Sequence, residues 1–202
     1  MSQEIQQIKT IVADPTPLGL FGLAMVTLVA SSQKLGITSG LSLVLPWAIF
    51  LGAFVQLIAC FFDFKHNNTF GATAFGAYAF FWFGIALSWL IKMGIFGEVL
   101  SSQADTKQLG FAFVGYLIFS LFMTLGAVET NKVLLIIFLL IDLLFFGLIG
   151  DVFGWFHSAH TLAAYAELGI AFFSFYGSGA ILLNKHFGKL FLPIGKPLGI
   201  FK

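Results

Sequence analysis

The sequence VLLIIFLLIDLLFFGLIGDV, residues 133–152, decides the fold class of this chain. All of its residues except Asp142, Gly147, Gly150 and Asp151 are large and apolar. A helix needs about 20 mostly apolar residues to cross a bilayer. A strand of a membrane β-barrel would instead alternate apolar and polar residues over about ten positions. Positions 133–140 are apolar without interruption, so the run predicts a transmembrane helix rather than a strand.

Five further apolar runs resemble this one, roughly at residues 18–32, 42–62, 70–91, 109–128 and 161–183. The first is short, and two glycines and two serines dilute it. No connecting segment is long enough to form a second domain. We therefore predict an all-α integral membrane bundle of six transmembrane helices. It would occupy residues 18–184, between an N-terminal segment at 1–17 and a Lys-rich tail at 185–202.

The composition supports a membrane protein. Of 202 residues, 59% are hydrophobic and only 9% are charged, whereas soluble domains carry about 25% charged residues. This scarcity of charge argues against a soluble domain, a disordered chain or a nucleic-acid binder. All ten basic residues are Lys, so the chain cannot build an anion site from a bidentate guanidinium group. The one cysteine, Cys60, allows neither an intramolecular disulfide nor a zinc site made of cysteines.

The distribution of Lys predicts how the chain is oriented. Cytoplasmic segments of membrane proteins carry an excess of Lys and Arg. With a cytoplasmic N-terminus, seven Lys fall on the cytoplasmic side and three on the other. The seven are Lys9, Lys65, Lys132, Lys185, Lys189, Lys196 and Lys202, and the three are Lys34, Lys92 and Lys107. We expect a multi-pass protein of the inner (plasma) membrane, with both termini cytoplasmic and every Lys outside the spans.

Two acidic residues lie well within the predicted spans, away from their ends, Asp142 in the fifth and Glu167 in the sixth. A charged side chain at the centre of a membrane helix costs about 2.5–3.5 kcal/mol, so such residues are functional candidates by default. Both are candidates for proton-linked transport. The alternative is a protonated carboxyl that only bonds a neighbouring helix, or a position nearer the membrane surface.

Neutral polar side chains in or beside the spans are the other candidates for substrate contact. They are Thr27, Gln56, Asn68, Thr69, Thr73, Trp82 and Ser174. Asn68 and Thr69 form a good helix cap, and the free N–H groups behind such a cap attract anions. Hydrogen bonding between helices is the alternative role for these residues. Small residues at Gly22, Gly71, Gly115, Gly126, Gly177 and Gly179 predict a tightly packed bundle.

Motifs of enzyme chemistry are missing from the sequence. It has no HExxH, no P-loop and no dinucleotide-binding glycine pattern. His157 and His160 are three residues apart in a predicted loop, where solvated histidines are more common than metal ligands. We therefore expect neither catalysis nor a cofactor or metal.

Three separated motifs carry a resemblance to a known family. The stretch Asp14-Pro15-Thr16-Pro17-Leu18-Gly19-Leu20 resembles the Asn-Pro-Ala-Pro-Leu-Gly-Leu motif of the acetate uptake transporter family. The stretch NTFGATAF at residues 68–75, followed by Tyr78 and Trp82, is similar to the start of that family's third helix. Asn184, then FG at 187–188 and LPIG at 192–195, is similar to its C-terminal end. The motifs agree in order and spacing along nearly the whole chain.

The resemblance implies a six-helix protomer in a homohexamer, with a substrate path through each protomer. In this family a Phe, a Tyr and a Leu form a narrow apolar constriction. The Tyr matches Tyr78, and the Phe position holds Leu23. The Leu falls on Ile141 when counted forward from Val133 and on Leu140 when counted back from Asp151.

Gln56 matches a polar position of the family. Asp14, Asp142 and Glu167 stand where the family has uncharged residues. If Asp142 or Glu167 faces the path, it should work in its protonated form, and uptake should then rise as the pH falls.

The expected function is a channel or proton-linked transporter for acetate and related small carboxylates, succinate among the candidates. A small carboxylate that must leave as easily as it arrives needs weak neutral donors. A channel for a neutral solute such as urea and a non-transporting membrane scaffold are the alternatives. A carrier with inverted repeats would show paired interrupted helices, and the absence of a second such helix from the sequence favours a channel.

Overall fold

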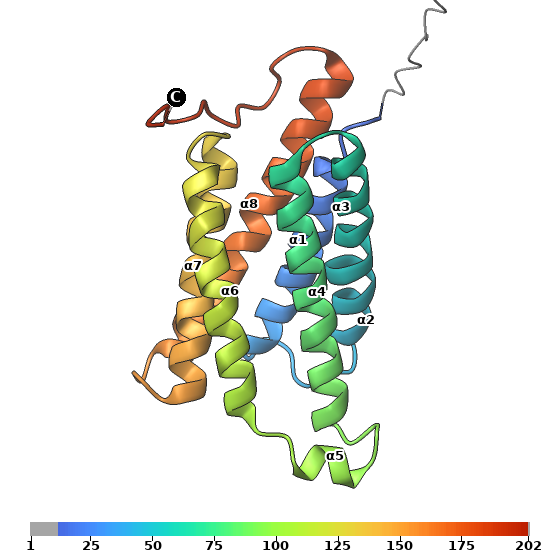
Figure 1. Ribbon diagram of the computed structural model, residues 1–202, viewed down its shortest axis with the longest axis vertical. Coiled ribbons are helices and arrows are strands. Elements are labelled where there is room, and N and C mark those ends of the chain that lie inside the picture. Colours follow the sequence, from blue (N-terminus) through green and yellow to red (C-terminus); the bar gives the residue numbers. More distant parts are fainter. Residues whose placement is uncertain (1–11, 202) are drawn as a thin grey trace, which may run out of the picture.

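The computed structural model describes residues 12–201, and every regular element in this part of the chain is a helix. Six helical stretches are long and apolar enough to cross a membrane, which confirms the predicted six-helix membrane bundle (Figure 1). They are α1 (Thr16–Lys34), the composite stretch Leu45–Lys65, α4 (Thr69–Lys92), α6 (Thr106–Ala127), α7 (Lys132–Phe153) and α8 (Ala159–Phe187). The short α5 (Glu98–Ser102) lies in the loop after α4. Most of the predicted N-terminal segment, residues 1–11, and Lys202 lie outside the described residues.

The second stretch contains an irregularity that the sequence did not predict. It starts as α2 (Leu45–Trp47), continues as the π-helix η1 (Ala48–Val55) and ends as α3 (Gln56–Lys65). π-Helical turns are rare and are frequently found at functional sites. Gln56 directly follows the last residue of η1. The wider turn of η1 therefore affects the direction in which the Gln56 side chain points.

Three of the long helices begin at the same end of the bundle, each with an Asp or Asn one or two residues before its first residue. Asp14 Oδ1 accepts a hydrogen bond from the backbone N–H of Thr16 at 2.9 Å. Asn68 Oδ1 accepts from Gly71 N at 3.1 Å, and Asn131 Oδ1 accepts from Leu134 N at 2.9 Å. Short polar side chains stabilise helix starts because they satisfy N–H groups that have no partner within the helix. We call this end of the bundle the Asp14 end.

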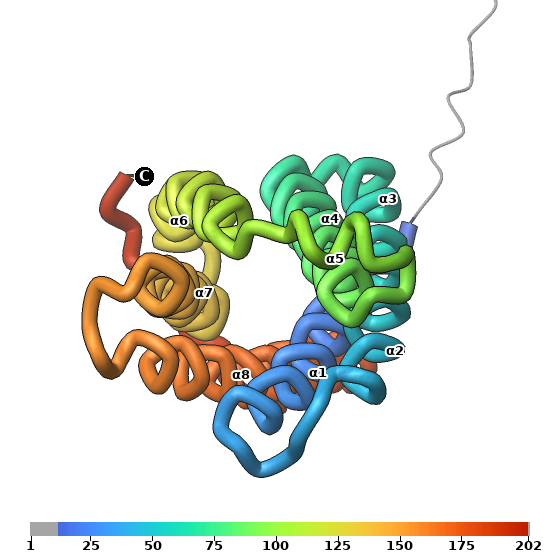
Figure 2. The backbone as a smooth tube through the Cα atoms, turned by 90° about the horizontal axis from the view of Figure 1, so that it is seen from below, coloured from blue at the N-terminus to red at the C-terminus, as the bar shows by residue number. Residues whose placement is uncertain are grey.

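The helices pack around one long axis. α8 packs against α1 and α7, and α4 packs against η1 and α3. Figure 2 shows the long helices around this axis when viewed from the other end. A Cβ added at Gly22 would lie 2.5 Å from the carbonyl oxygen of Leu51, and Gly71, Gly126 and Gly177 also have close neighbours. Gly115 and Gly179 face open space within the described chain, so four of the six predicted packing glycines contact another part of it.

Both ends of the described chain lie at the Asp14 end (Figure 1). The last helix continues to Phe187, and the segment after it folds back over the start of α7. Ile194 O accepts a hydrogen bond from Val133 N at 3.1 Å, and Glu129 Oε1 accepts from the N–H groups of Ile200 and Phe201. The predicted tail is thus held against the bundle.

Candidate functional site

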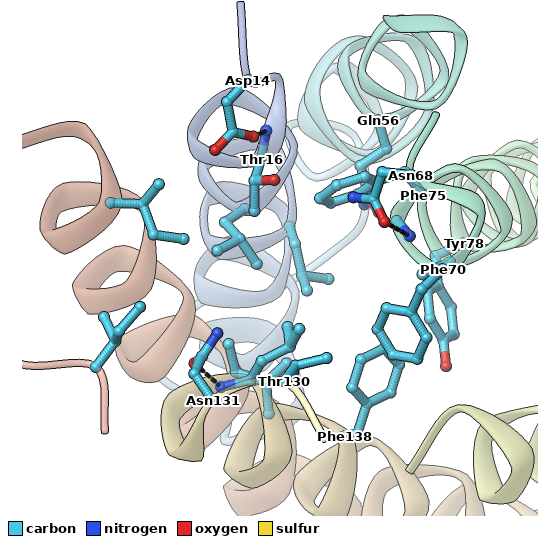
Figure 3. Close-up of a pocket in the computed structure, with 18 of the residues that line it drawn as sticks. Asp14, Thr16, Gln56, Asn68, Phe70, Phe75, Tyr78, Thr130, Asn131 and Phe138 are labelled. Carbon is cyan, nitrogen blue, oxygen red and sulfur yellow. Dashed lines mark hydrogen bonds between the residues drawn. The ribbon is translucent and has the colours of Figure 1, made fainter. Parts of the chain in front are cut away.

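A cavity of about 340 Å³ opens at the Asp14 end, and we call it the first cavity (Figure 3). Residues from α1, α3, α4, α7, α8 and the C-terminal segment line it. They are Asp14, Thr16, Leu20, Leu23, Gln56, Asn68, Phe70, Gly71, Ala74, Phe75, Tyr78, Thr130, Asn131, Leu134, Ile137, Phe138, Ile141, Ile181 and Ile194. Asp14 is the one residue in this lining with a formal charge, so the rest of the wall is apolar or neutral.

The mouth of the first cavity is formed by helix starts. Asp14, Asn68 and Asn131 all line it, and Figure 3 shows their capping hydrogen bonds around it. The N-terminus of a helix carries a partial positive charge of roughly half an elementary charge. The mouth therefore offers three partial positive charges, one of which is opposed by the Asp14 carboxylate.

The deeper part of the first cavity contains three of the predicted constriction residues, Leu23, Tyr78 and Ile141. The Tyr78 hydroxyl donates to Ser120 Oγ at 3.2 Å, and its ring packs against the rings of Tyr116, Phe119 and Phe138. This aromatic packing holds the Tyr78 ring in one position, and its hydroxyl is directed toward α6.

Ile141 and Leu140, which sequence counting left as alternatives, lie on different faces of α7. Ile141 is buried and lines the first cavity. Leu140 packs against Gly169 of α8 and does not line the cavity, since a Cβ at that glycine would lie 3.1 Å from Leu140 Cδ1. The geometry therefore brings Ile141, and not Leu140, next to Leu23 and Tyr78.

Gln56 is a buried polar side chain that no other described residue pairs with. It is fully buried, it lines the first cavity, and neither its Oε1 nor its Nε2 has a hydrogen-bond partner among the described residues. A buried polar group left unpaired costs about 1–3 kcal/mol. The Gln56 amide lies in the wall of the cavity and has no hydrogen-bond partner among the described residues, so it is available to a ligand.

A second cavity of about 90 Å³ lies further along the same helices, toward the end of the bundle opposite Asp14. On α4 its lining residues Phe81 and Trp82 follow Tyr78 by about one turn, and on α7 Leu144 follows Ile141 in the same way. The full lining is Lys34, Phe81, Trp82, Ile85, Trp89, Leu109, Phe113, Leu144, Leu148 and Glu167. The predicted contact residue Trp82 thus lies in this second cavity.

Lys34 is largely buried in the structure, at the end of a helix rather than in a loop. It is the last residue of α1, and its Nζ lies 2.8 Å from Glu167 Oε2. The side chains of Lys34 and Glu167 are only 15% and 2% exposed. Sequence reasoning placed Lys34 in a loop because the apolar run stops at Ser32, and it could not see a partner 133 residues away.

Asp142 lies outside both cavities. Its Oδ2 accepts a hydrogen bond from Thr124 Oγ1 at 2.6 Å, which joins α7 to α6. The other carboxylate oxygen is buried and has no partner among the described residues. This bond to α6 is the contact with a neighbouring helix that was the alternative role for Asp142.

The remaining predicted contact residues are dispersed. Thr27 is buried, and its hydroxyl donates to the Leu23 carbonyl oxygen in its own helix at 2.7 Å. Ser174 is buried and its hydroxyl has no partner among the described residues. Thr69 and Thr73 are exposed. None of these four residues lines either cavity.

Asp63 and Asn131 were missed from the sequence. Asp63 is fully buried, and its Oδ1 accepts a hydrogen bond from Asn68 Nδ2 at 3.0 Å. Asp63 lies just beyond the second apolar run, close to Lys65 and His66. From the sequence it therefore resembles a solvated loop residue. Asn131 did carry a signal, because it precedes an apolar run as Asn68 does. His160, which belongs to α8, contacts Asp151 Oδ2 at 3.1 Å.

The comparisons with known proteins agree with this geometry. The model of the GPR1/FUN34/yaaH family matches residues 2–194. The chain is 32% identical to the succinate-acetate/proton symporter SatP of Escherichia coli strain K12 over 189 residues, which cover 93% of this chain and 97% of the relative. It is 30% identical to acetate permease A of Emericella nidulans over 141 residues, which cover 66% and 47%.

A solved structure has the same fold. The bacterial acetate channel SatP superposes with a TM-score of 0.84 at 31% sequence identity, covering 92% of this chain and 100% of that one. The family model, the Escherichia coli relative and the solved structure extend over nearly all of the helical bundle, and they confirm the resemblance that the three sequence motifs carried. This multi-pass membrane chain therefore belongs to the GPR1/FUN34/yaaH family.

Proposed function

We propose that this chain carries acetate and related small carboxylates across the membrane, through a path that includes the first cavity. The observation that carries the proposal is the unpartnered Gln56 amide in an otherwise mostly apolar wall. An amide N–H donates to a carboxylate without the permanent charge that would trap it. Leu23, Tyr78 and Ile141 form an apolar neck that suits the acetate methyl group. Two relatives, an acetate channel and a succinate-acetate/proton symporter, support the same substrate class.

The orientation and assembly are part of this proposal. The excess of Lys at the Asp14 end supports a cytoplasmic position for both termini in the inner (plasma) membrane. The resemblance supports a homohexamer with one path in each protomer. Large apolar side chains on the outer face, among them Phe50, Phe111, Phe122 and Phe172, would meet lipid or a neighbouring protomer.

Flux of labelled acetate and labelled urea into proteoliposomes tests the function. Acetate flux above that of protein-free liposomes supports the proposal. Urea flux without acetate flux would point to a neutral-solute channel, and the absence of both would point to a scaffold.

Leu23→Phe tests the role of the neck in selectivity. The larger ring narrows the first cavity where Tyr78 and Ile141 also line it. We expect succinate flux to fall about ten-fold relative to acetate flux, because a tighter pocket discriminates by size. Parallel uptake of labelled succinate and labelled acetate into proteoliposomes measures the ratio. Leu23→Ile, which conserves side-chain volume, serves as the control, and an unchanged ratio in Leu23→Phe would place Leu23 outside the neck.

A further inference from the structure

The second cavity contains a charge pair in an apolar surrounding. Lys34 Nζ and Glu167 Oε2 are 2.8 Å apart, and every other residue in the lining is Leu, Ile, Phe or Trp. Within the described chain, Glu167 is the one hydrogen-bond partner of the ammonium group. Since an ammonium has three N–H donors, two remain available to a ligand. Replacing such a buried pair by apolar residues is often neutral or stabilising, so packing alone gives little reason for it.

We propose that Lys34 and Glu167 form a carboxylate-binding site that couples each substrate anion to one proton. A small monocarboxylate takes the place of Glu167 on the Lys34 ammonium, and Glu167 takes up the proton. This inference rests on the proposed function, because it assumes that the second cavity continues the path of the first. The two linings follow one another along α4 and α7, where Tyr78 and Ile141 line one cavity and Phe81 and Leu144, three residues further on, line the other.

The charge balance of the cavity requires the proton. The pair alone is neutral, and an added carboxylate would leave a net charge of −1 among aromatic side chains. A buried carboxylate without a partner costs several kcal/mol, which is more than an ammonium can offset when it faces two anions. With one proton on Glu167, the cavity holds an ammonium, one carboxylate and a neutral carboxyl group. Glu167 takes this proton from the water on the side where the substrate enters. When the substrate leaves on the other side, Glu167 releases the proton to the water there and pairs with Lys34 again.

The other ionisable groups near the pair lie at its edge. His160 of α8 contacts the backbone carbonyl oxygen of Lys34 through Nε2 at 3.1 Å, and its Nδ1 lies 3.1 Å from Asp151 Oδ2 of α7. Both of these side chains are about half exposed and neither lines the cavity. The residues that α4 and α6 contribute to the lining are not ionisable. A pH effect that arises at His160 is therefore separable by mutation from one that arises at Glu167.

The experiment measures whether acetate moves with net charge. Protein is reconstituted into liposomes, a potassium gradient with valinomycin sets a potential of 100 mV, and uptake of labelled acetate is corrected for protein-free liposomes. A one-to-one movement of acetate and proton is electroneutral, so the potential should leave wild-type uptake unchanged. In Glu167→Gln no carboxylate of the protein competes with acetate for the Lys34 ammonium, so acetate binds there without uptake of a proton. Acetate should then move as an anion, and the potential should change its accumulation by up to about 50-fold.

Two control variants locate the effect. Asp142→Asn, at a residue outside both cavities, and His160→Gln, at the edge of the pair, should both stay electroneutral. The double variant Lys34→Gln/Glu167→Gln removes both charges and retains side chains of similar size. It should move acetate more weakly and without proton coupling. This variant decides the question if Glu167→Gln does not run as a single species in size-exclusion chromatography.

Different outcomes overturn different statements. A wild-type protein that moves no acetate would overturn the proposed function and this site with it. Wild-type uptake that responds to the potential would overturn only the coupling site. Electroneutral uptake with the pH dependence of the wild type in Glu167→Gln, or in the double variant, would also overturn it.

Discussion

Replacing Gln56 by Leu is expected to lower acetate flux by about ten-fold or more while leaving the Tm of the purified protein unchanged or higher. A hydrogen bond to a charged group is worth about 1.5–3 kcal/mol, and 1.4 kcal/mol corresponds to about ten-fold. The stability should not fall, because Leu has a similar volume and removes two buried polar atoms that have no partner among the described residues. Loss of flux without loss of stability would separate a substrate contact from a packing role.

Ser174→Ala is the matched control for this prediction. Its hydroxyl is also buried and without a partner among the described residues, but it does not line the first cavity. Both variants remove an unsatisfied buried group, so both should keep the Tm. Flux measured in proteoliposomes should fall only in Gln56→Leu. Equal flux in the two variants would remove Gln56 from the path, and a Tm that falls only in Gln56→Leu would give its amide a structural role.

The helices and some of the site were predictable because their signals are local. The length and polarity of a run such as residues 133–152 can be read directly from the sequence. Gln56 is likewise visible as an amide within an apolar span. Contacts between helices leave no such local signal. The ion pair of Lys34 and Glu167 joins two residues that are 133 positions apart, and the hydrogen bond between Thr124 and Asp142 joins neighbouring helices.

The sequence also did not determine which face of a helix a given side chain lies on. Counting along the sequence left Leu140 and Ile141 as equal candidates for the neck. A shift of one residue rotates a side chain by about 100° around a helix with 3.6 residues per turn. The packing of Leu140 against Gly169 settles which of the two faces α8. The π-helix η1 was not predictable either. Its local sequence is apolar throughout, and the wider turn of a π-helix depends on contacts with neighbouring helices.

Replacing Gly22 by Val is expected to lower the Tm by roughly 6–12 °C and to abolish most acetate flux. A Cβ at this position would lie 2.5 Å from the carbonyl oxygen of Leu51 and 3.0 Å from a methyl group of Val55. The oxygen belongs to the backbone of η1 and cannot move aside as a side chain can, so α1 must shift away from η1. Overpacking of this kind costs about 3 kcal/mol at its upper range, and each kcal/mol shifts the Tm of a chain of this size by about 2–4 °C.

The functional loss follows from the position of Gly22 between two parts of the site. The next residue on α1 is Leu23, which lines the first cavity, and η1 leads directly into Gln56. A shift of α1 against η1 therefore changes the distance across the cavity as well as the packing. Gly179→Val is the matched control, because no other helix of the described chain comes within 4 Å of a Cβ at that glycine, and it carries the same β-branched cost in a helix. A Tm and an acetate flux that fall equally in both variants would show that the cost of Val in a helix, rather than the close approach of α1 to η1, is responsible.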